Sequence, residues 1–304
     1  MESQSKLGSM TMSTLEENEP SFFRLCEGRN FAVLLRAILD RVPVLVVGPD
    51  EYRCDRLSSL LFSLVGNFRQ LETYATSFLD AADLRAVYQG ERDDPTKPRA
   101  IFLATSEVAP RATREFDKFD GWVFHVNPED YREVQRAVLA VSGGVVACFL
   151  NDSWNLEVQL IGDGLEDLGE NSHLESLLKS LRNRVNQSIV GVERIVEGIV
   201  VAAKAENPQY ALLVEDSPLL DYSQEKESLL KEAVAAELDN FYISCFCAFT
   251  IFKKMEEARA AGLPQVRARR KSLGSLLPHK KVDVKRVFGF IRRNWGVDPA
   301  QHFD

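Results

Sequence analysis

The chain has 304 residues, of which 45% are hydrophobic and 27% are charged, and this composition is typical of a soluble globular protein. Its formal net charge of -8 excludes a general affinity of the whole surface for nucleic acid, so no nucleic-acid partner is expected. The length is sufficient for one large domain or two moderate ones.

The cysteines and the N-terminal segment both indicate a cytoplasmic protein. The five cysteines show no C-x-x-C spacing, and we expect buried free thiols rather than disulfides or a zinc site: Cys26, Cys54, Cys148, Cys245 and Cys247. The segment 1–20 is polar and acidic, lacks the apolar core of a signal peptide, and is expected to be disordered. The most apolar helical segment, 241–252, is too short to span a bilayer.

The stretch 42–68 carries the first strong structural pattern. Four apolar residues, 44–47, follow one another without alternation, which is typical of a strand buried on both faces of a parallel sheet. Gly48, Pro49 and Asp50 end this strand with turn chemistry. Apolar residues at three- and four-residue spacing then predict a helix, and a further helix is expected before the strand, within 21–41.

Four more strands and one helix are expected before residue 162. The strands are predicted at 100–104, 122–126, 145–150 and 156–161, with a further short strand at 73–78. The side chain of Asn127, followed by Pro128, predicts a helix start with Asn127 as N-cap, and Gly143 with Gly144 predicts its end. Residues 156–161 alternate between apolar and polar, as expected of a half-exposed antiparallel edge strand.

The composition becomes helical after an acidic linker at 163–171. Three helices are expected at 172–203, 223–262 and 283–294. The sequence therefore predicts an α/β protein with a mixed, mostly parallel central sheet flanked by helices, followed by an all-helical second lobe. The expected divisions are a tail at 1–20, a sheet lobe at 21–162 and a helical lobe at 163–304 that contains a basic loop at 265–281.

The loop after strand 44–47 is a candidate ligand site, because ligands of α/β proteins bind at the carboxyl ends of strands. A phosphate-binding loop needs several glycines, a lysine and a hydroxyl side chain, whereas this loop has one glycine, Gly48. Pro49 lacks an N–H donor, and Asp50 and Glu51 place negative charge where phosphate would bind. Asp50 is better explained as a helix N-cap. An enzyme that binds a nucleotide or a phosphorylated ligand after strand 44–47 stays an alternative.

No catalytic or metal-binding pattern is found, so catalytic residues, metal and cofactor are all predicted to be none. The four histidines are scattered and none has metal-ligand spacing. His125 ends an apolar strand, and two interpretations apply to it: a residue facing a cleft with Asp130, or a hydrogen-bonded structural histidine, which we favour. Ser142 does not lie in a nucleophile elbow.

Positive charge concentrates near the C-terminal end of the chain. The residues predicted to contact an acidic partner, a membrane surface or phosphate are Arg267, Arg269, Arg270, Lys271, Lys280 and Lys281. Ser272 follows three basic residues and is a predicted phosphorylation site, where phosphate would reduce the local positive charge. A solubilising, solvent-exposed face explains the same charges as well.

The order of elements resembles that of the DENN domain at the C-terminal end of folliculin-type proteins. Gly28–Val47 is similar to the entry from helix into sheet, and Trp122–His125 is similar to a neighbouring strand. Tyr131–Leu150 and Trp154–Ile161 resemble the helix, strand and edge strand that follow, and Val282–Arg293 resembles the closing helix. The resemblance spans most of residues 21–295. The long helical part departs from it, and the chain has no room for the longin domain that carries the GTPase-activating arginine in that family, so no catalytic residue is transferred.

The resemblance implies a protein-interaction module that binds and regulates a small GTPase of the Rab or Rag type, by guanine-nucleotide exchange or within a complex. The implied partners are the GTPase and either a second DENN- or longin-type protein or a second copy of the chain. We also expect a cytoplasmic protein that is recruited to membranes, with peripheral contact through the basic segment. The alternatives are the enzyme described above and a non-catalytic signalling scaffold with a phosphorylated basic segment.

Overall fold

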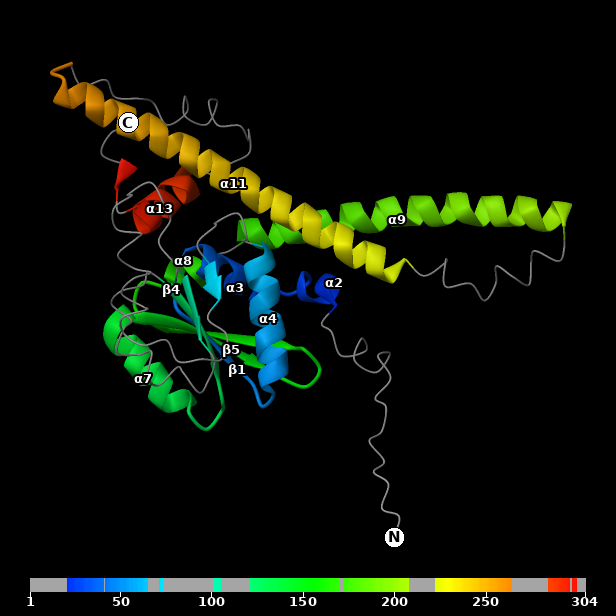
Figure 1. Ribbon diagram of the computed structural model, residues 1–304, viewed down its shortest axis with the longest axis horizontal. Helices are drawn as coiled ribbons and strands as arrows, with labels where there is room; N and C mark the ends of the chain where they lie inside the picture. Colours follow the sequence, from blue (N-terminus) through cyan, green and yellow to red (C-terminus); the bar gives the residue numbers. More distant parts are fainter. Residues whose placement is uncertain are drawn as a thin grey trace, which may run out of the picture.

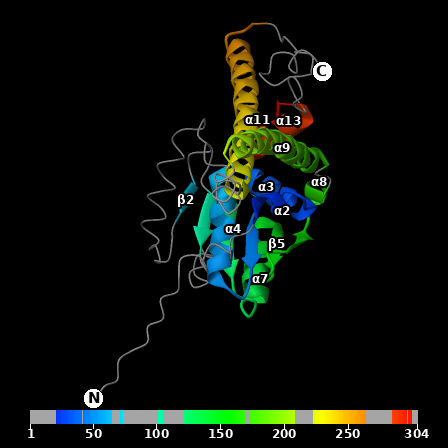
Figure 2. The same cartoon turned by 90° about the vertical axis from the view of Figure 1, so that its right-hand side faces the viewer.

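The computed structural model describes residues 21–40, 42–64, 71–73, 101–104, 121–169, 172–207, 222–263, 284–295 and 297–299. Within these residues, six strands form one sheet in the order β2-β3-β4-β1-β5-β6 (Figures 1 and 2). The strands are β1 (Val44–Val47), β2 (Leu71–Thr73), β3 (Ile101–Ala104), β4 (Gly121–Val126), β5 (Gly144–Leu150) and β6 (Leu156–Gly162). The helices are α2 (Phe22–Leu25), α3 (Arg29–Leu39), α4 (Glu51–Leu64), α7 (Tyr131–Ser142), α8 (Glu166–Gly169), α9 (Ser172–Glu206), α11 (Ser223–Ala260) and α13 (Val284–Trp295).

The sheet is parallel except at one edge, as predicted. β1 lies at its centre and pairs in parallel with β4 and with β5, and β2, β3 and β4 continue the parallel order on one side. β6 pairs antiparallel with β5, and its residues alternate between half-buried and exposed over most of their length. The predicted α/β fold with a mixed, mostly parallel sheet and an edge strand at 156–161 is therefore confirmed.

Both faces of β1 are covered, which explains its uninterrupted apolar run. Val44 and Val46 belong to the core beneath α3 and α4, together with Val146 and Cys148 of the neighbouring strand. The alternate residues of β1 and β5, such as Val47 and Phe149, point to the opposite face of the sheet, towards α7. On that face the ring centroids of Tyr131 and Phe149 are 5.1 Å apart. Because successive strand residues point to opposite faces, burial of all four residues requires a helix layer on each side.

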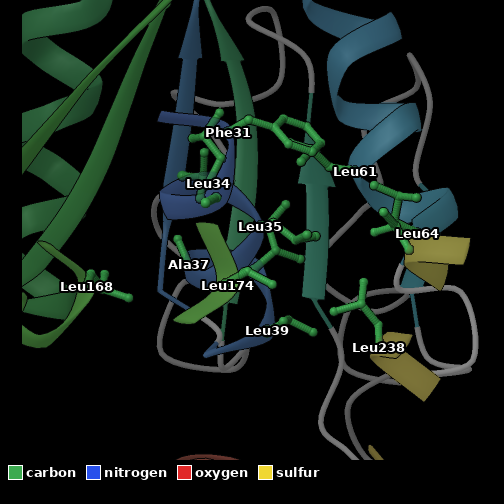
Figure 3. Packing of buried hydrophobic residues seen from close by; sticks show 14 of the residues in the cluster. Phe31, Leu34, Leu35, Ala37, Leu39, Leu61, Leu64, Leu168, Leu174 and Leu238 are labelled. Atoms are coloured by element: carbon green, nitrogen blue, oxygen red, sulfur yellow. The ribbon is translucent and has the colours of Figure 1, made fainter. Parts of the chain in front are cut away.

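The principal core lies where α3 and α4 meet the helical part. α3 places Phe31, Leu34 and Leu35 in full burial, and Figure 3 shows them beside Leu61 of α4 and Leu238 of α11. Full burial of each such side chain contributes about 1.5–3 kcal/mol relative to exposure. The same cluster extends through α9, α11 and α13, so the sheet part and the helical part share one continuous core.

The helical part consists mainly of α9 and α11, which lie above α3 and α4 in both overall views (Figures 1 and 2). An ion pair links them, with Lys226 Nζ 3.1 Å from Glu193 Oε1. α13 packs on α11 through aromatic contacts, with the Phe241 and Phe290 ring centroids 5.5 Å apart. The C-terminal half of α9 extends past the sheet part (Figure 1). The predicted succession of a sheet layer and then long helices is confirmed.

Among the described helices, α11 is long and apolar enough to cross a membrane by length and composition. The expectation based on 241–252 alone therefore underestimated the length of this apolar helix. Its residues Leu230, Val234 and Leu238 are buried in the core, and packing of this kind accounts for the apolar composition of a core helix.

One local prediction was wrong. Helix α7 begins at Tyr131 rather than at Pro128, because the Asp130 N–H binds the Asn127 carbonyl at 3.0 Å and closes a turn before the helix. Asn127 is therefore not the N-cap. Strand β2 covers Leu71–Thr73, so it overlaps the expected strand at 73–78 only at its first residue, and residues 74–78 lie outside the described part of the chain. The predicted end of helix α7 at Gly143 is confirmed, since Gly143 adopts a left-handed φ of 71° at the C-cap.

Candidate functional site

The carboxyl end of β1 was the sequence-predicted ligand position, and helix α4 packs directly on it. A Cβ atom added to Gly48 would lie 2.7 Å from Cys54 Sγ, so glycine permits this close approach. The Gly48 N–H continues the sheet by binding the Val126 carbonyl at 3.4 Å. The strand end is therefore occupied by the first turns of α4.

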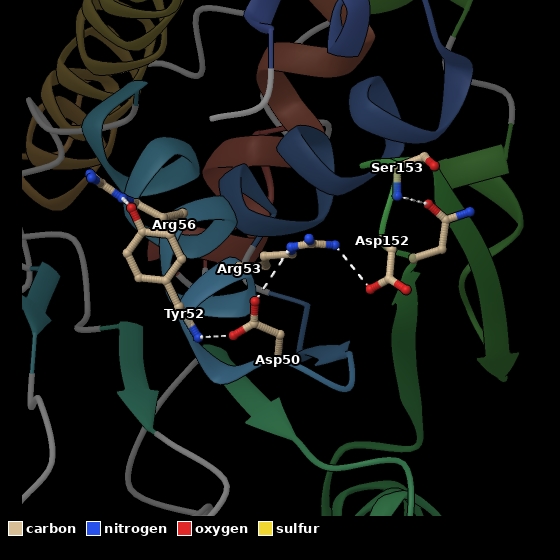
Figure 4. A network of polar contacts seen from close by, with 7 residues as sticks. Asp50, Tyr52, Arg53, Arg56, Asp152 and Ser153 are labelled. Carbon is tan, nitrogen blue, oxygen red and sulfur yellow. Dashed lines mark hydrogen bonds and ion pairs between the residues drawn. The ribbon is translucent and has the colours of Figure 1, made fainter. Parts of the chain in front are cut away.

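Asp50 caps α4, as the sequence predicts. Its Oδ1 accepts the backbone N–H of Tyr52 at 3.0 Å, and its Oδ2 lies 3.4 Å from Arg53 Nε (Figure 4). A helix N-terminus favours negative charge because its first N–H groups lack intrahelical acceptors. The Asp50 carboxylate provides that charge, at the position where a phosphate would otherwise bind.

Arg53 joins α4 to the turn between β5 and β6. Its Nη1 binds Asp152 Oδ1 at 3.0 Å (Figure 4), and its guanidinium lies 5.9 Å from the centroid of the Trp154 ring. Asn151 shapes this turn, since its Oδ1 accepts the N–H groups of Ser153 and Asn155 at 2.9 and 3.0 Å. Trp154 has a φ of 59°, a left-handed conformation that costs about 1–3 kcal/mol in a non-glycine residue. The turn thus holds Asp152 and Trp154 against Arg53.

The outer side of this cluster presents an aromatic ring and charges to solvent. We define the α4 surface as Tyr52, Arg53, Arg56 and Asp152. Arg56 Nε donates to Tyr52 Oη at 3.0 Å, and its guanidinium lies 5.2 Å from the ring centroid (Figure 4). Tyr52 keeps 42% of its surface exposed in spite of this contact. Exposed tyrosine and arginine side chains held in fixed positions are typical of protein-contact surfaces.

His125 lies inside the protein rather than in a cleft. It is buried beneath α4, whereas Asp130 is exposed, so the interpretation that joined these two residues was wrong. Its Nε2 lies 2.8 Å from Ser58 Oγ, and Ser58 Oγ is also 2.9 Å from the Cys54 carbonyl. Burial lowers the pKa of His125 from its ordinary value. Ser58 is fully buried as well, so this serine–histidine pair has no access to a substrate in solution.

The cysteines are free thiols, as predicted, and four of the five are buried. Burial raises the pKa of Cys54 to about 12 and also raises that of Cys148. Neither thiol therefore forms a thiolate nucleophile at neutral pH. Among the described residues, no group of three or more histidine, cysteine or carboxylate side chains is arranged to hold a metal ion.

The predicted basic segment is outside the described residues. This applies to Arg267, Arg269, Arg270, Lys271, Lys280 and Lys281 and to the predicted phosphorylation site Ser272. Their role stays a prediction. The α4 surface was not predicted from the sequence, although the spacing of Tyr52 and Arg56 by one helical turn is a signal for their contact. The meeting of Arg53 with Asp152 depends on the sheet register and had no local signal.

Comparison of the chain with protein-family models, with curated proteins and with solved structures finds no match. The resemblance to the DENN domain therefore rests on the order of elements and on the residues quoted for it.

Proposed function

We propose that this chain is a protein-interaction module that binds and regulates a small GTPase of the Rab or Rag type, with the α4 surface as its contact. The observation that carries the proposal is the arrangement at the end of β1. Asp50 and Arg53 occupy the position where α/β enzymes hold ligands, while Tyr52 and Arg56 are presented outward. The DENN-like order of elements supplies the class of partner.

The occupied strand end disfavours an enzyme that binds nucleotide or phosphate there. An incoming phosphate would have to displace the Asp50 carboxylate from the Tyr52 N–H and from Arg53, both of which it already binds. It would also approach two carboxylates of like charge, Asp50 at the cap and Glu51 in the first turn. A protein partner needs no such displacement, because it would contact side chains that are already exposed.

The α4 surface has the chemistry of an interface centre with a polar rim. Tyr52 offers a large ring whose orientation is fixed by Arg56, so little side-chain freedom would be lost on binding. Asp152 is exposed and already paired with Arg53, which presents a charge of each sign at a fixed separation. Such paired charges favour one orientation of a partner over others.

The test is binding of purified Rab- and Rag-type GTPases in the GDP-bound, GTP-bound and nucleotide-free states, together with release of a fluorescent GDP. We expect binding in at least one state and a loss of 10-fold or more, about 1.4 kcal/mol or above, for Tyr52→Ala and Arg56→Ala. Leu229→Ala is the matched control, because Leu229 is 43% exposed but lies on α11. Absence of binding in every state would overturn the proposal.

A thermal-shift measurement separates this proposal from the enzyme alternative. A nucleotide that binds the folded chain raises its melting temperature by mass action. We expect no shift with nucleoside di- and triphosphates. A shift that rises with nucleotide concentration, disappears in Arg53→Ala and persists or grows in Asp50→Ala would instead favour the enzyme.

A further inference from the structure

One apolar stripe runs along the whole of α9, but the described part of the chain packs against only its first half. The stripe steps by alternating four and three residues, and its members are Leu174, Leu178, Leu181, Val185, Ser188, Val192, Ile195, Ile199 and Ala202. This is a heptad pattern of the kind that packs one helix on another. The first three residues are buried in the core, and Val185 is half-buried.

The second half of the same stripe faces solvent. Val192, Ile195 and Ile199 are 44%, 65% and 62% exposed, although each is a large aliphatic residue. They lie on the half of α9 that extends past the sheet part (Figure 1). Glu193, which binds Lys226 of α11, lies about 120–160° around the helix from Ile195 and Ile199. The contact with α11 therefore leaves this stripe uncovered.

The positions beside the exposed stripe carry no charge, and all but Val196 are small. Gly191 and Gly198 recur at the same heptad position, and a Cβ added to either would meet nothing within 4 Å. Ala205 follows seven residues later, and Val196 and Ala203 flank the other side. Small flanking residues let a second helix approach closely, and uncharged ones add no repulsion between identical chains.

We propose that residues 188–206 of α9 form an antiparallel pair with the same segment of a second copy of this chain. The two-fold axis crosses the pair at the level of residue 197, midway along the segment. In this register Val192 meets the second copy's Ala202, and Ile195 meets its Ile199. The segment is about 28 Å long, and it ends against the second copy's Ser188, where the covered half of the stripe begins.

Two further observations favour this orientation. In a parallel pair the two sheet parts would lie side by side at the same end of the helices. The second helix would there meet the half of the stripe from Leu174 to Leu181, which the core already covers. In the antiparallel pair the two sheet parts lie at opposite ends. Glu206, at the end of one helix, then falls within one turn of the second copy's Arg184, an exposed side chain that is 3.8 Å from Glu237 in its own chain. This places opposite charges at both ends of the interface.

The first test is sedimentation of the full chain over a range of concentrations. The contact is one helix pair and lies at the small end of specific interfaces, so we expect a reversible shift from 34.2 kDa to twice that mass as the concentration rises. A chain that sediments as a monomer at every concentration overturns the proposal, as does a larger closed assembly. If another part of the same chain covers the stripe, the chain will sediment as a monomer at every concentration.

Matched charge variants then identify the face. Ile195→Glu should shift dimerisation to at least 10-fold higher concentration, because it places a carboxylate in the centre of the pair. Val201→Glu is the control, since Val201 is also 65% exposed but lies about 120° around the helix from Ile195. Circular dichroism checks that both variants fold. Equal dimerisation of the two variants overturns the assignment of this face.

Crosslinking and charge exchange test the antiparallel register. With Cys247 changed to serine, Gly198→Cys should form an intermolecular disulfide, because residue 198 lies beside the axis. Val192→Cys should not, because the two copies of residue 192 would be about 15 Å apart along the axis. Efficient crosslinking at 192 would indicate a parallel pair and overturn the proposal. Arg184→Glu should weaken the dimer, and Glu206→Arg in the same chain should restore it; the absence of rescue would contradict the register.

Discussion

The carboxylate of Glu227 on α11 caps the first turn of α2, where its Oε2 accepts the backbone N–H of Phe22 at 2.6 Å. Its Oε1 also accepts the Ser21 hydroxyl at 2.6 Å, and the Phe23 N–H lies 3.3 Å from Oε2. The two residues are 205 positions apart in sequence. Ser21 is the N-cap of α2 and its side chain accepts the Arg24 N–H, while Glu227 from the helical part supplies acceptors for the N–H groups that precede it.

Replacing Glu227 should weaken the attachment of α2 to α11. We expect Glu227→Ala to lower the free energy of unfolding by about 1.5–3 kcal/mol, because charge-assisted hydrogen bonds to N–H groups with no other acceptor would be lost. Glu227→Gln keeps the acceptor oxygen but not the charge and should cost less. Urea unfolding measures both changes. Glu232→Ala, on the exposed side of the same helix, is the control and should stay within about 0.5 kcal/mol of the parent.

Phe31 should be among the most costly residues to truncate. It is fully buried, and its ring centroid lies 5.6 Å from that of Phe22 in an edge-to-face contact. Phe31→Ala would leave a cavity between α3 and the core and should cost about 3–5 kcal/mol. Ile243→Ala, at a half-exposed position on α11, should cost far less. Similar losses for the two variants in chemical denaturation would contradict the placement of α3 in the core.

The buried His125 should make stability depend on pH. Burial lowers its folded-state pKa below the ordinary value of 6.5, so the unfolded chain binds a proton more readily than the folded one. The stability that the neutral imidazole provides is therefore complete above about pH 6.5. It is lost as the pH falls through the folded pKa.

The measurement compares the parent with His125→Gln in urea between about pH 8 and pH 5. The glutamine keeps a polar group near Ser58 but does not titrate in this range. We expect the parent to lose more stability than the variant on acidification. Parallel pH profiles would show that His125 is protonated as easily in the folded chain as in the unfolded one.

The thiols should differ sharply in reactivity. Cys26, Cys54, Cys148 and Cys245 are buried, and burial raises the pKa of each of them. Cys247 is only half-buried. Brief alkylation of the native chain near pH 8, read by mass spectrometry, should modify Cys247 first, and all five should react in denaturant. Rapid native labelling of Cys54 would contradict the close packing of α4 on the end of β1.

The sequence was most informative where local pattern and tertiary environment agree. The unbroken apolar residues Val44–Val47 predict a strand covered on both faces, and α3 with α4 and α7 provide that cover. The left-handed Gly143 ended α7 as its sequence predicts. In these cases the residue type alone restricts the backbone, so no distant contact is needed to interpret it.

The sequence was least informative where a distant residue decides the outcome. The partner of His125 is Ser58, 67 positions away, and Glu227, 205 positions from Phe22, adds acceptors to the start of α2 beside the local cap Ser21. The prediction that Asn127 caps the start of α7 was wrong for a local reason, because an Asn–Pro sequence suits a turn as well as a helix N-terminus. The α4 surface combines Arg53 with Asp152 from another loop, so it becomes visible only when the strand order is known.

The central position of β1 also has a consequence for synthesis of the chain. Val44 leaves the ribosome well before its sheet partners Val123 and Val146 exist. At about 5–20 residues per second, an apolar strand with two open edges waits several seconds for its neighbours. Newly made chains therefore pass through a stage in which β1 is open to pairing with other nascent strands. We expect the yield of folded protein to depend on chaperones more than it does for a protein whose first strand lies at a sheet edge.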